Sequence, residues 1–350
     1  MTATDPGGTV RFRLETPDAT VTAVFLECDP AVPGDRRLTR SDGAWRLDLP
    51  VPALDRLEYR FAVHRGEHVE VVLDPDNPRQ VRTAFGDRSV LELPGYVEPW
   101  WLGVPAPAGR LDPQTVAGET ADDVPVTVWS PDGLDDRDPA PLLVVHDGPE
   151  YDDLASLTRY TAALVHTGAL PPHRVALAHP VMRDAWYSGS PRYLRTMAEA
   201  GLDRLGERYA TVGPVAVMGA SLGGLTALLL GVTAGPRVGA VLAQSGSFFQ
   251  VRHDDSESGY RYFGRISRSV QQVLDTRHAE HPLVVGMTCG AMEENAANNR
   301  DMAAALARAG HRVTYAETRD LHNYTAWRDA LDPVLGEVLR TVWAPERMPG

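Results

Sequence analysis

The chain has 350 residues, enough for one large domain or two unequal ones. Its composition, 43% hydrophobic and 23% charged, is that of a folded globular protein and excludes a disordered one. A formal net charge of -13 argues against nucleic acid or an anionic membrane surface as a partner, because both select for basic proteins.

Targeting and redox features indicate a reducing compartment. The opening residues, MTATDPGGTVRFRLE, lack a basic region followed by an apolar stretch, which predicts no signal peptide and a cytoplasmic protein. Cys28 and Cys289 lie far apart, so no disulfide framework is expected. A long uncharged segment between Arg208 and Arg237 is divided by a Gly-Pro pair and a Gly-rich turn. Each part is too short to span ~30 Å of hydrocarbon, so no membrane span is expected.

Residues 1–100 are predicted to form a small antiparallel β-sandwich of the immunoglobulin-like kind. Alternating runs, each bounded by Gly, Pro or Asp clusters, occupy residues 20–26, 44–49 and 57–63. Asp74 and Asp76 fall in a turn that contains proline and asparagine, where Asx hydrogen bonds explain them better than a metal site. The sequence predicts no metal site and no cofactor.

Residues 101–113 are predicted to link two domains, because they belong to a stretch from Pro94 to Pro113 that is rich in Pro and Gly. Over residues 114–346 the pattern changes to apolar, strand-like runs separated by segments of helical periodicity. The strand-like runs occupy residues 124–129, 141–146, 174–178, 214–218, 238–243, 282–287 and 312–316. This alternation predicts an α/β domain with a mostly parallel sheet covered by helices on both faces.

The stretch from Val215 to Leu230, VAVMGASLGGLTALLL, predicts a strand, a sharp turn and a helix. It contains Gly-x-Ser-x-Gly, the nucleophile-elbow pattern of the α/β-hydrolase fold. Ser221 stands at the apex of the turn, and glycines at 219 and 223 remove side chains that would collide with it. The pattern predicts Ser221 as a catalytic nucleophile, with a plain turn or a phosphate-binding loop as the alternative.

In this fold the acid and the histidine follow the serine along the chain. After the run at 282–287 come Glu293 and Glu294, and we assign the acid to Glu293, with Glu294 as its rival. After the run at 313–317 comes His322, assigned as the general base. A neutral imidazole takes the serine proton, and a carboxylate orients the imidazole. The alternatives are a surface histidine and a solvated carboxylate at a helix start.

Hydrolases of this kind place a second oxyanion donor in the loop after their third strand. Here that strand runs into the sequence His-Asp-Gly-Pro. Pro149 has no amide hydrogen, so we assign the two donors to the backbone amides of Leu222 and Gly148. His146 and Asp147 are interpreted as structural turn residues rather than catalytic ones.

These motifs together resemble the enterochelin esterase family, a branch of the esterase D-like α/β hydrolases. Besides the Gly219–Gly224 elbow, Glu293 and His322, the resemblance rests on Tyr59-Arg60-Phe61, Asp74-Pro75-Asp76-Asn77-Pro78, Gln244-Ser245-Gly246-Ser247-Phe248-Phe249, Cys289-Gly290, Asn299-Arg300, Gly310-His311 and Trp327-Arg328. It covers nearly the whole chain. It implies a cytoplasmic serine esterase that cleaves the ester bonds of a small-molecule substrate, a cyclic trilactone catecholate siderophore or related macrolactone.

Three positions depart from the family pattern. Family members usually carry Gly-Gly before the catalytic histidine, where this chain has Asp320-Leu321. An arginine after the fourth strand is usually followed three residues on by glutamate, whereas Arg183 is followed by Trp186. The glutamine or glutamate that usually precedes the nucleophile is Ala220 here. The serine, histidine and acid are retained, so the departures concern the substrate rather than hydrolysis.

Residues 248–268, FFQVRHDDSESGYRYFGRISR, are rich in aromatic residues and arginine for so acidic a protein. As a cap over the serine, they would suit an aromatic, anionic ligand. The residues assigned to substrate binding are Arg183, Trp186, Tyr187, Phe248, Phe249, Arg252 and Arg261. The alternative is a solvated insertion whose arginines pair with Asp254, Asp255 and Glu257.

Two other functions are compatible with the sequence. One is a carbohydrate or feruloyl-type carboxylesterase whose β-domain binds glycan, and the expected lack of a secretion signal argues against it. The other is a catalytically silent homologue that only binds a ligand. The intact set of Ser221, Glu293 and His322 argues against that function, because a strained turn costs free energy and serves no purpose in a site that no longer catalyses a reaction.

Overall fold

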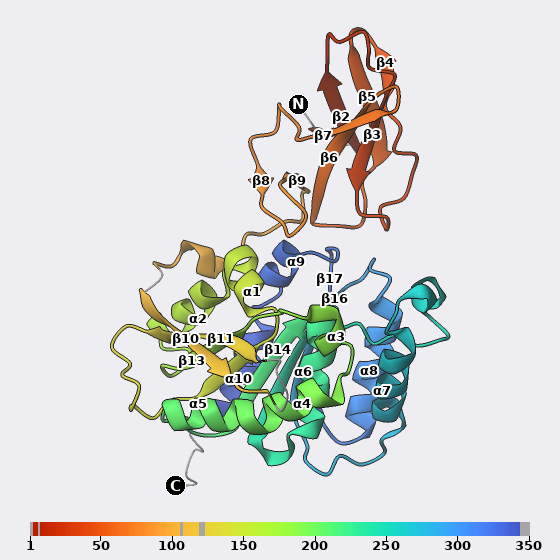
Figure 1. Ribbon diagram of the computed structural model, residues 1–350. Helices are drawn as coiled ribbons and strands as arrows, with labels where there is room; N and C mark the ends of the chain where they lie inside the picture. The colour runs from red at the N-terminus through yellow and green to blue at the C-terminus, as the bar shows by residue number, and fades with distance from the viewer. Residues whose placement is uncertain (1–2, 6–7, 106–107, 119–122, 344–350) are drawn as a thin grey trace. The chain divides into compact units, whose positions relative to one another are not determined.

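The computed structural model describes residues 3–5, 8–105, 108–118 and 123–343. The chain divides into two compact units (Figure 1): Met1–Glu98 with Arg319–Asn323, and Pro99–Thr318 with Tyr324–Gly350. Within the described ranges, every helix is too short or too polar to cross a lipid bilayer.

The first unit is a sandwich of two antiparallel sheets. One sheet has the order β1 (Ala3–Asp5), β2 (Thr9–Glu15), β5 (Ala44–Pro50), β4 (Thr39–Ser41). The other has the order β3 (Ala23–Cys28), β6 (Arg56–Arg65), β9 (Arg88–Glu92), β8 (Gln80–Val81), with β7 (His68–Val72) also paired to β6. Alternate side chains of β2, β3 and β6 are buried, whereas the side chains of β4 are exposed. The rings of Phe12 and Tyr59 meet edge to face with centroids 5.0 Å apart.

The turn after β7 is held by a buried aspartate. Asp74 is fully buried and accepts a hydrogen bond from the hydroxyl of Tyr59 at 2.7 Å. The backbone amide of Asp76 donates to Asp74 Oδ1 at 2.9 Å. The predicted Asx turn is therefore confirmed, because the Asp74 carboxylate accepts the hydrogen bond from the amide two residues later, as a backbone carbonyl does in an ordinary turn.

The second unit is built on an eight-stranded sheet (Figure 1). In sheet order its strands are β10 (Gly109–Val116), β11 (Val124–Pro131), β13 (Arg174–Ala178), β12 (Leu142–Val145), β14 (Val215–Ala220), β15 (Val238–Gln244), β16 (Val284–Gly290) and β17 (Arg312–Thr318). The six strands from β13 to β17 are parallel, and β10 and β11 are antiparallel to their neighbours. The predicted mostly parallel sheet is confirmed.

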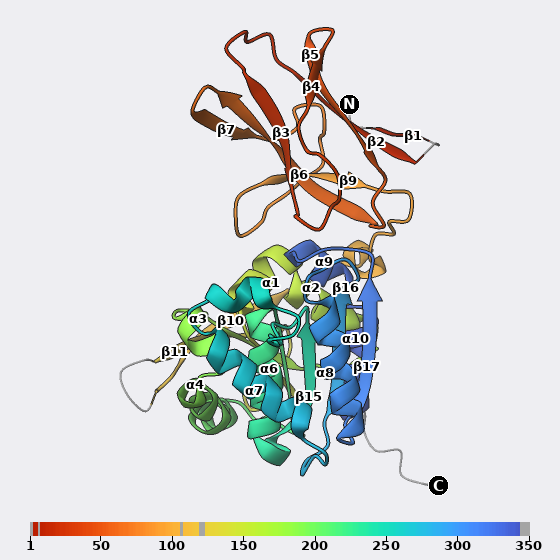
Figure 2. The same cartoon turned by 90° about the vertical axis from the view of Figure 1, so that its right-hand side faces the viewer.

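Helices cover both faces of this sheet. One face is covered by α1 (Gly148–Ala155), α2 (Leu157–His166), α9 (Tyr324–Asp329) and α10 (Val334–Trp343). The other is covered by α3 (Arg183–Tyr187), α4 (Pro191–Thr196), α5 (Leu202–Arg208), α6 (Leu222–Thr233), α7 (Phe263–Asp275) and α8 (Ala296–Arg308), of which α6, α7 and α8 stand out in Figure 2. Because consecutive residues of a strand face opposite ways, Val217 packs in one core and Met218 in the other.

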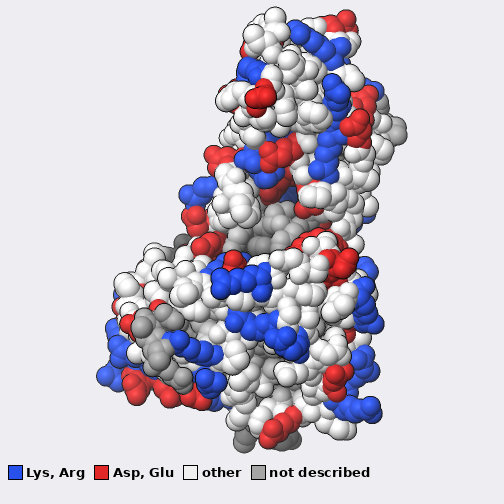
Figure 3. Space-filling view, turned by 45° about the vertical axis from the view of Figure 1, so that its right-hand side comes forward, with Lys and Arg blue, Asp and Glu red and all other residues white. Residues whose placement is uncertain are grey.

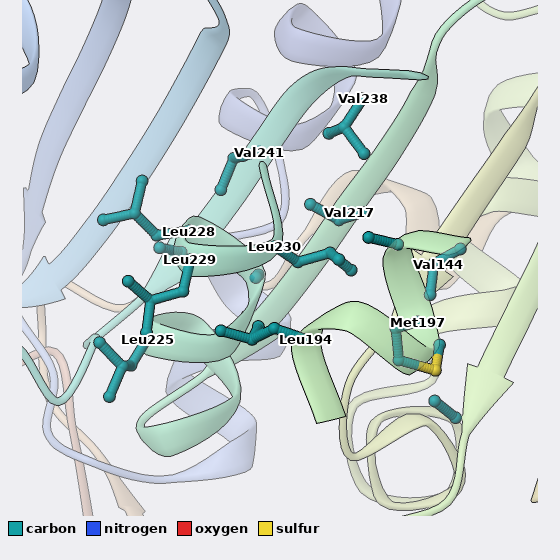
Figure 4. Packing of buried hydrophobic residues seen from close by; sticks show 14 of the residues in the cluster. Val144, Leu194, Met197, Val217, Leu225, Leu228, Leu229, Leu230, Val238 and Val241 are labelled. Carbon is teal, nitrogen blue, oxygen red and sulfur yellow. The ribbon is translucent and has the colours of Figure 1, made fainter. Parts of the chain in front are cut away.

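Helix α6 lies at the centre of one core (Figure 4). Its leucines 225, 228, 229 and 230 are buried and pack with Val217 and Val241 of the sheet. A helix that is apolar on all sides is stable only when surrounded, which explains the uncharged sequence of this segment. Burying each leucine contributes about 1.5–3 kcal/mol, so the turn that precedes α6 is anchored by a helix that is buried in the core.

The structure differs from the sequence prediction at the end of the expected linker. Residues Gly109–Val116 form strand β10, although the composition up to Pro113 predicts an irregular segment. Pro113 is tolerated because β10 lies at the edge of the sheet and pairs on one side only, with β11.

Candidate active site

The serine of the Gly-x-Ser-x-Gly pattern lies in a strained turn. Ser221 follows β14 and precedes α6 with φ 55° and ψ -125°, a conformation that L-residues rarely adopt. A Cβ atom at Gly219 would lie 2.4 Å from the carbonyl carbon of Gly223, so position 219 cannot carry a side chain. The Ser221 amide donates to the Gln244 carbonyl at 2.9 Å, and the Ser221 carbonyl accepts from the Ser247 amide at 3.0 Å. Packing and hydrogen bonds together hold the strained conformation.

Two helices begin beside each other at this edge of the sheet. Strands β12 and β14 are parallel neighbours with Val145 opposite Met218, so Gly148 and Ser221 each lie three residues beyond a paired position. Gly148 begins α1, and Leu222 begins α6. Neither of these two amides donates a hydrogen bond to an acceptor in the part of the chain that the structure describes. Such amides can stabilise an oxyanion, and the helix dipoles add to the effect.

A buried ion pair follows β12. Asp147 is 2% exposed, and its carboxylate accepts two hydrogen bonds from the Arg183 guanidinium, from Nε at 2.8 Å and from Nη2 at 2.9 Å. The backbone amide of Asp147 donates to the hydroxyl of Tyr187 at 3.3 Å. Burial raises the pKa of Asp147, and the Arg183 charge opposes that rise. Both side chains therefore act on the turn that leads to Gly148, which agrees with the structural interpretation of this loop.

Two fully buried histidines make stability depend on pH. Burial lowers the pKa of His146 and of His173 to about 4, whereas an unfolded histidine has a pKa of about 6.5. Between these two pKa values the unfolded chain binds more protons than the folded chain. The contribution of the two histidines to stability is therefore fully present above about pH 6.5 and is lost as the pH falls toward 4.

We expect the free energy of unfolding, measured with urea, to fall between pH 7 and pH 5 by on the order of 2 kcal/mol for each of the two histidines. His173 lies away from Ser221 and accompanies Trp343 in the core, with ring centroids 5.0 Å apart. His173→Asn should therefore flatten the slope between these pH values without touching the site. An unchanged slope in this variant would contradict the prediction.

The candidate acid is buried in a polar network after β15 and β16. Glu293 Oε1 accepts hydrogen bonds from the Gly290 amide at 2.7 Å and from the Ser245 hydroxyl at 2.8 Å. The indole of Trp327 donates to that same hydroxyl at 3.0 Å. Glu294, the rival carboxylate, has an exposed side chain. Glu293 is thus held in a defined orientation at the carboxyl end of β16.

The candidate base lies between β17 and α9. His322 is exposed and belongs to the segment Arg319–Asn323, whose contacts group it with the first unit. Within that unit the guanidinium of Arg56 donates to the Asp320 carboxylate at 2.7 Å, and Arg56 is 3% exposed. Asp320, which replaces a glycine of the family pattern, therefore fastens the loop that carries His322. Because β17 is parallel to β14, this loop leaves the sheet at the same edge as Ser221.

The four aromatic residues assigned to substrate binding fall into a fully buried pair and a pair with a little exposed surface. Tyr187 and Phe248 have no exposed surface and pack within the core, so they support the site from beneath. Trp186, 7% exposed, stacks on Tyr193 with centroids 5.2 Å apart. Phe249 stacks on Phe263 with centroids 6.0 Å apart.

The arginines of the 248–268 segment are arranged differently from the solvated alternative. Arg252 pairs with Asp301, and the Arg261 guanidinium lies 5.2 Å from the centre of the Tyr262 ring. Among the described residues, no arginine pairs with Asp254, Asp255 or Glu257. Asp254 is instead buried and accepts from the Asn298 amide group at 3.0 Å. Figure 3 shows arginine patches on the second unit, all blue side chains being arginine because the sequence contains no lysine.

Sequence reasoning missed two features of the site. The Ser247 hydroxyl lies 3.3 Å from the Ser221 hydroxyl, and the Asp147–Arg183 pair joins residues 36 positions apart. Ser247 follows a strand end in a segment rich in small residues, which is a signal that the sequence contains. The ion pair has no such local signal.

Comparisons with known proteins identify the family and the fold. The sequence model of the Esterase family, described as "Putative esterase", matches residues 117–338. No protein of curated function matches the chain in sequence.

Several solved structures have the same fold. The enterobactin esterase of Shigella flexneri, determined in the presence of enterobactin, superposes with a TM-score of 0.75 at 20% identity, covering 96% of this chain and 92% of that one. The ferric enterobactin esterase of Salmonella typhimurium gives 0.79 at 19% identity, covering 97% and 96%. The feruloyl esterase module of Clostridium thermocellum, complexed with sinapinate, gives 0.52 at 14% identity, covering 72% and 96%. The predicted α/β-hydrolase fold preceded by a β-sandwich is confirmed.

Proposed function

Because this chain belongs to the esterase family and is a carboxylic-ester hydrolase, we propose that it works through an acyl-enzyme formed on Ser221. One observation carries this proposal. Ser221 occupies a strained turn at the start of α6, and the first amides of α6 and α1 lie at the ends of neighbouring strands. A strained serine beside two helix starts is suited to form and stabilise a tetrahedral oxyanion.

The proposed reaction has two halves. His322 takes the hydroxyl proton as Ser221 Oγ attacks the ester carbonyl carbon, and the resulting oxyanion accepts hydrogen bonds from the Leu222 and Gly148 amides. Collapse breaks the ester C–O bond, and the imidazolium gives its proton to the leaving alkoxide. Water then attacks the acyl carbon with the help of the same base and donors, and the acid product leaves.

Glu293 is the proposed orienting acid. Its carboxylate is buried at the carboxyl end of β16, and the next strand, β17, leads into the loop with His322. In this role Glu293 keeps the imidazole in the tautomer that accepts the serine proton and stabilises the imidazolium that forms.

Exchanging the two candidate carboxylates tests this assignment. We expect Glu293→Gln to lower kcat roughly 10²- to 10⁴-fold, because an amide keeps the shape but not the charge that stabilises imidazolium. Glu294→Gln is the matched variant and should stay close to wild type, since its side chain is exposed. Steady-state rates on a neutral aryl ester measure both. A large loss in Glu294→Gln alone would move the acid to that residue.

The proposed substrate is a cyclic trilactone catecholate siderophore, iron-free or iron-loaded, or a related macrolactone, and the proposed compartment is the cytoplasm. Support comes from the motifs shared with enterochelin esterases and from the fold likeness to esterases of enterobactin over nearly the whole chain. The segment 248–268 also offers partly exposed rings, Tyr260 and Tyr262, next to the exposed guanidinium of Arg261. Rings can stack on catechols, and guanidinium attracts their oxyanions.

Mass spectrometry of products tests the substrate. Wild type and Ser221→Ala are each incubated with the tri-catecholate trilactone, with and without iron. The proposal expects linear trimer, dimer or monomer from wild type only, and the faster of the two substrates tells whether cleavage precedes or follows iron release. No opening of either form, together with ready cleavage of a simple aryl ester, would discard the siderophore and keep the hydrolase.

A hydroxycinnamate ester is the second candidate substrate. This chain is similar in fold to feruloyl and ferulic acid esterases over 67–73% of its length. Methyl ferulate in the same experiment distinguishes the two candidate substrates. We expect slow release of ferulate if the trilactone is the substrate, and fast release if a hydroxycinnamate ester is the substrate.

A further inference from the structure

The turn that presents the Gly148 amide is unusual at its first residue. Asp147 has φ 54° and ψ 37°, the left-handed conformation that favours glycine or asparagine. It is the residue that precedes the first turn of α1, where an aspartate carboxylate normally accepts hydrogen bonds from the first helix amides. Here the Asp147 side chain makes no such bond. The amides at the start of α1 are therefore left for another acceptor.

Arg183 explains why the carboxylate turns away. Its Nε and Nη2 atoms occupy both carboxylate oxygens, at 2.8 and 2.9 Å, and the side chain of Asp147 is 3% exposed. A bidentate pair of this kind sets the carboxylate orientation as well as neutralising its charge. The Tyr187 hydroxyl, 3.3 Å from the Asp147 amide, secures the backbone of the same residue.

The carboxylate of Asp147 also lies against the start of α6, the helix that begins with the other proposed oxyanion donor, Leu222. A Cβ atom at Gly223 would be 3.0 Å from Asp147 Oδ2 and 3.4 Å from the Cβ of His146. Gly223 is the second residue of α6, directly after Leu222. Asp147 therefore stands between the starts of both helices, where an unpaired negative charge would repel the oxyanion that the amides are meant to receive.

We propose that Arg183 is a positioning residue for ester hydrolysis: it holds the Asp147 carboxylate away from the start of α1, so that the Gly148 amide stays open to the oxyanion. This inference rests on the proposed function of the same site. It gives Arg183 a role different from the substrate contact that the sequence predicts, and the two roles lead to opposite kinetic results.

Removing the guanidinium tests the inference. In Arg183→Met the freed carboxylate should turn to cap α1, and kcat should fall roughly 10²-fold, as for the loss of one oxyanion donor, with KM within about twofold. The loss should be equal for neutral and anionic esters. Affinity for an aryl boronic acid, which mimics the tetrahedral intermediate, should fall in parallel. Arg237→Met is the control. Arg237 forms an exposed ion pair with Asp203 and directly precedes β15, at the opposite end of that strand from Gln244, whose carbonyl binds the Ser221 amide. This variant should therefore leave all values unchanged.

The decisive variant removes the carboxylate as well. Arg183→Met with Asp147→Gly should recover most of the lost kcat, because no charge remains to occupy the amides and glycine adopts the left-handed conformation without strain. A double variant no faster than the single one would overturn the inference, as would a rise in KM for anionic esters with kcat unchanged. Circular dichroism establishes folding, and Arg183→Lys, which keeps the charge, serves if Arg183→Met does not fold. Failure of the proposed function would be separate, since it would show as activity in Ser221→Ala.

Discussion

Ser221→Ala is expected to lower kcat for any ester substrate by on the order of 10⁶-fold, the loss seen when a nucleophile is removed from a unit that acts together. The residual rate would come from the oxyanion amides and substrate binding alone. The fold should persist, because alanine keeps the Cβ that already fits the turn and loses one hydrogen bond, the 3.3 Å contact with the Ser247 hydroxyl. Thermal unfolding and aryl-ester kinetics on the same preparation measure both effects.

Ser247→Ala is the matched control for this variant. Its hydroxyl lies within hydrogen-bond distance of Ser221 Oγ, but Ser247 does not have the positive φ of Ser221. We expect Ser247→Ala to keep most of its activity. If Ser221→Ala kept its turnover and Ser247→Ala lost it, the nucleophile would be Ser247 and the assignment to Ser221 would be wrong.

His322→Ala is expected to have the second largest effect, a loss of kcat of roughly 10⁴- to 10⁶-fold, because a serine hydroxyl is a weak nucleophile without a base. KM should change little, since the imidazole acts mainly on the transition state. Added imidazole should restore part of the rate in this variant, because a small base can enter the space that the side chain leaves.

His166→Ala is the comparison for His322→Ala. His166 ends α2, on the face of the sheet that carries α1 and α10, and takes no part in the proposed chemistry. It should retain the wild-type rate, and imidazole should not alter it. Full activity in His322→Ala would remove this residue from the mechanism and leave the base to be found among the other histidines.

Much of the fold follows from local pattern. The predicted strand at 174–178 coincides with β13, and the strand, turn and helix around Ser221 are present as β14, the elbow and α6. Buried parallel strands are apolar throughout, and their period differs from that of the helices between them, so neighbouring residues suffice to recognise both. The predicted linker ends at Pro113, whereas strand β10 already begins at Gly109, because composition does not distinguish an edge strand from a loop.

The candidate site divides in the same way. The glycine at 219 indicates the strained serine from within five residues, because a Cβ atom there would collide with the backbone of Gly223. The neighbours of Gly223 are instead His146 and Asp147, which are distant in the sequence. Sequence reasoning assigns the acid to Glu293 and keeps its neighbour Glu294 as a rival, and the fold distinguishes the two because it buries Glu293 and exposes Glu294. Burial depends on which strands are neighbours, and that order is a property of the whole sheet.

The order of residues alone predicts the class of chemistry: a serine in a tight turn before an apolar helix, followed by a carboxylate and a histidine. The contacts around that serine come from the folded arrangement of the sheet and helices. It brings Arg183 to Asp147 and sets aside Tyr187 and Phe248 as core. The physical reason is range: steric strain and periodicity act between residues close in sequence, whereas ion pairs and burial act between elements that meet only when the sheet has formed.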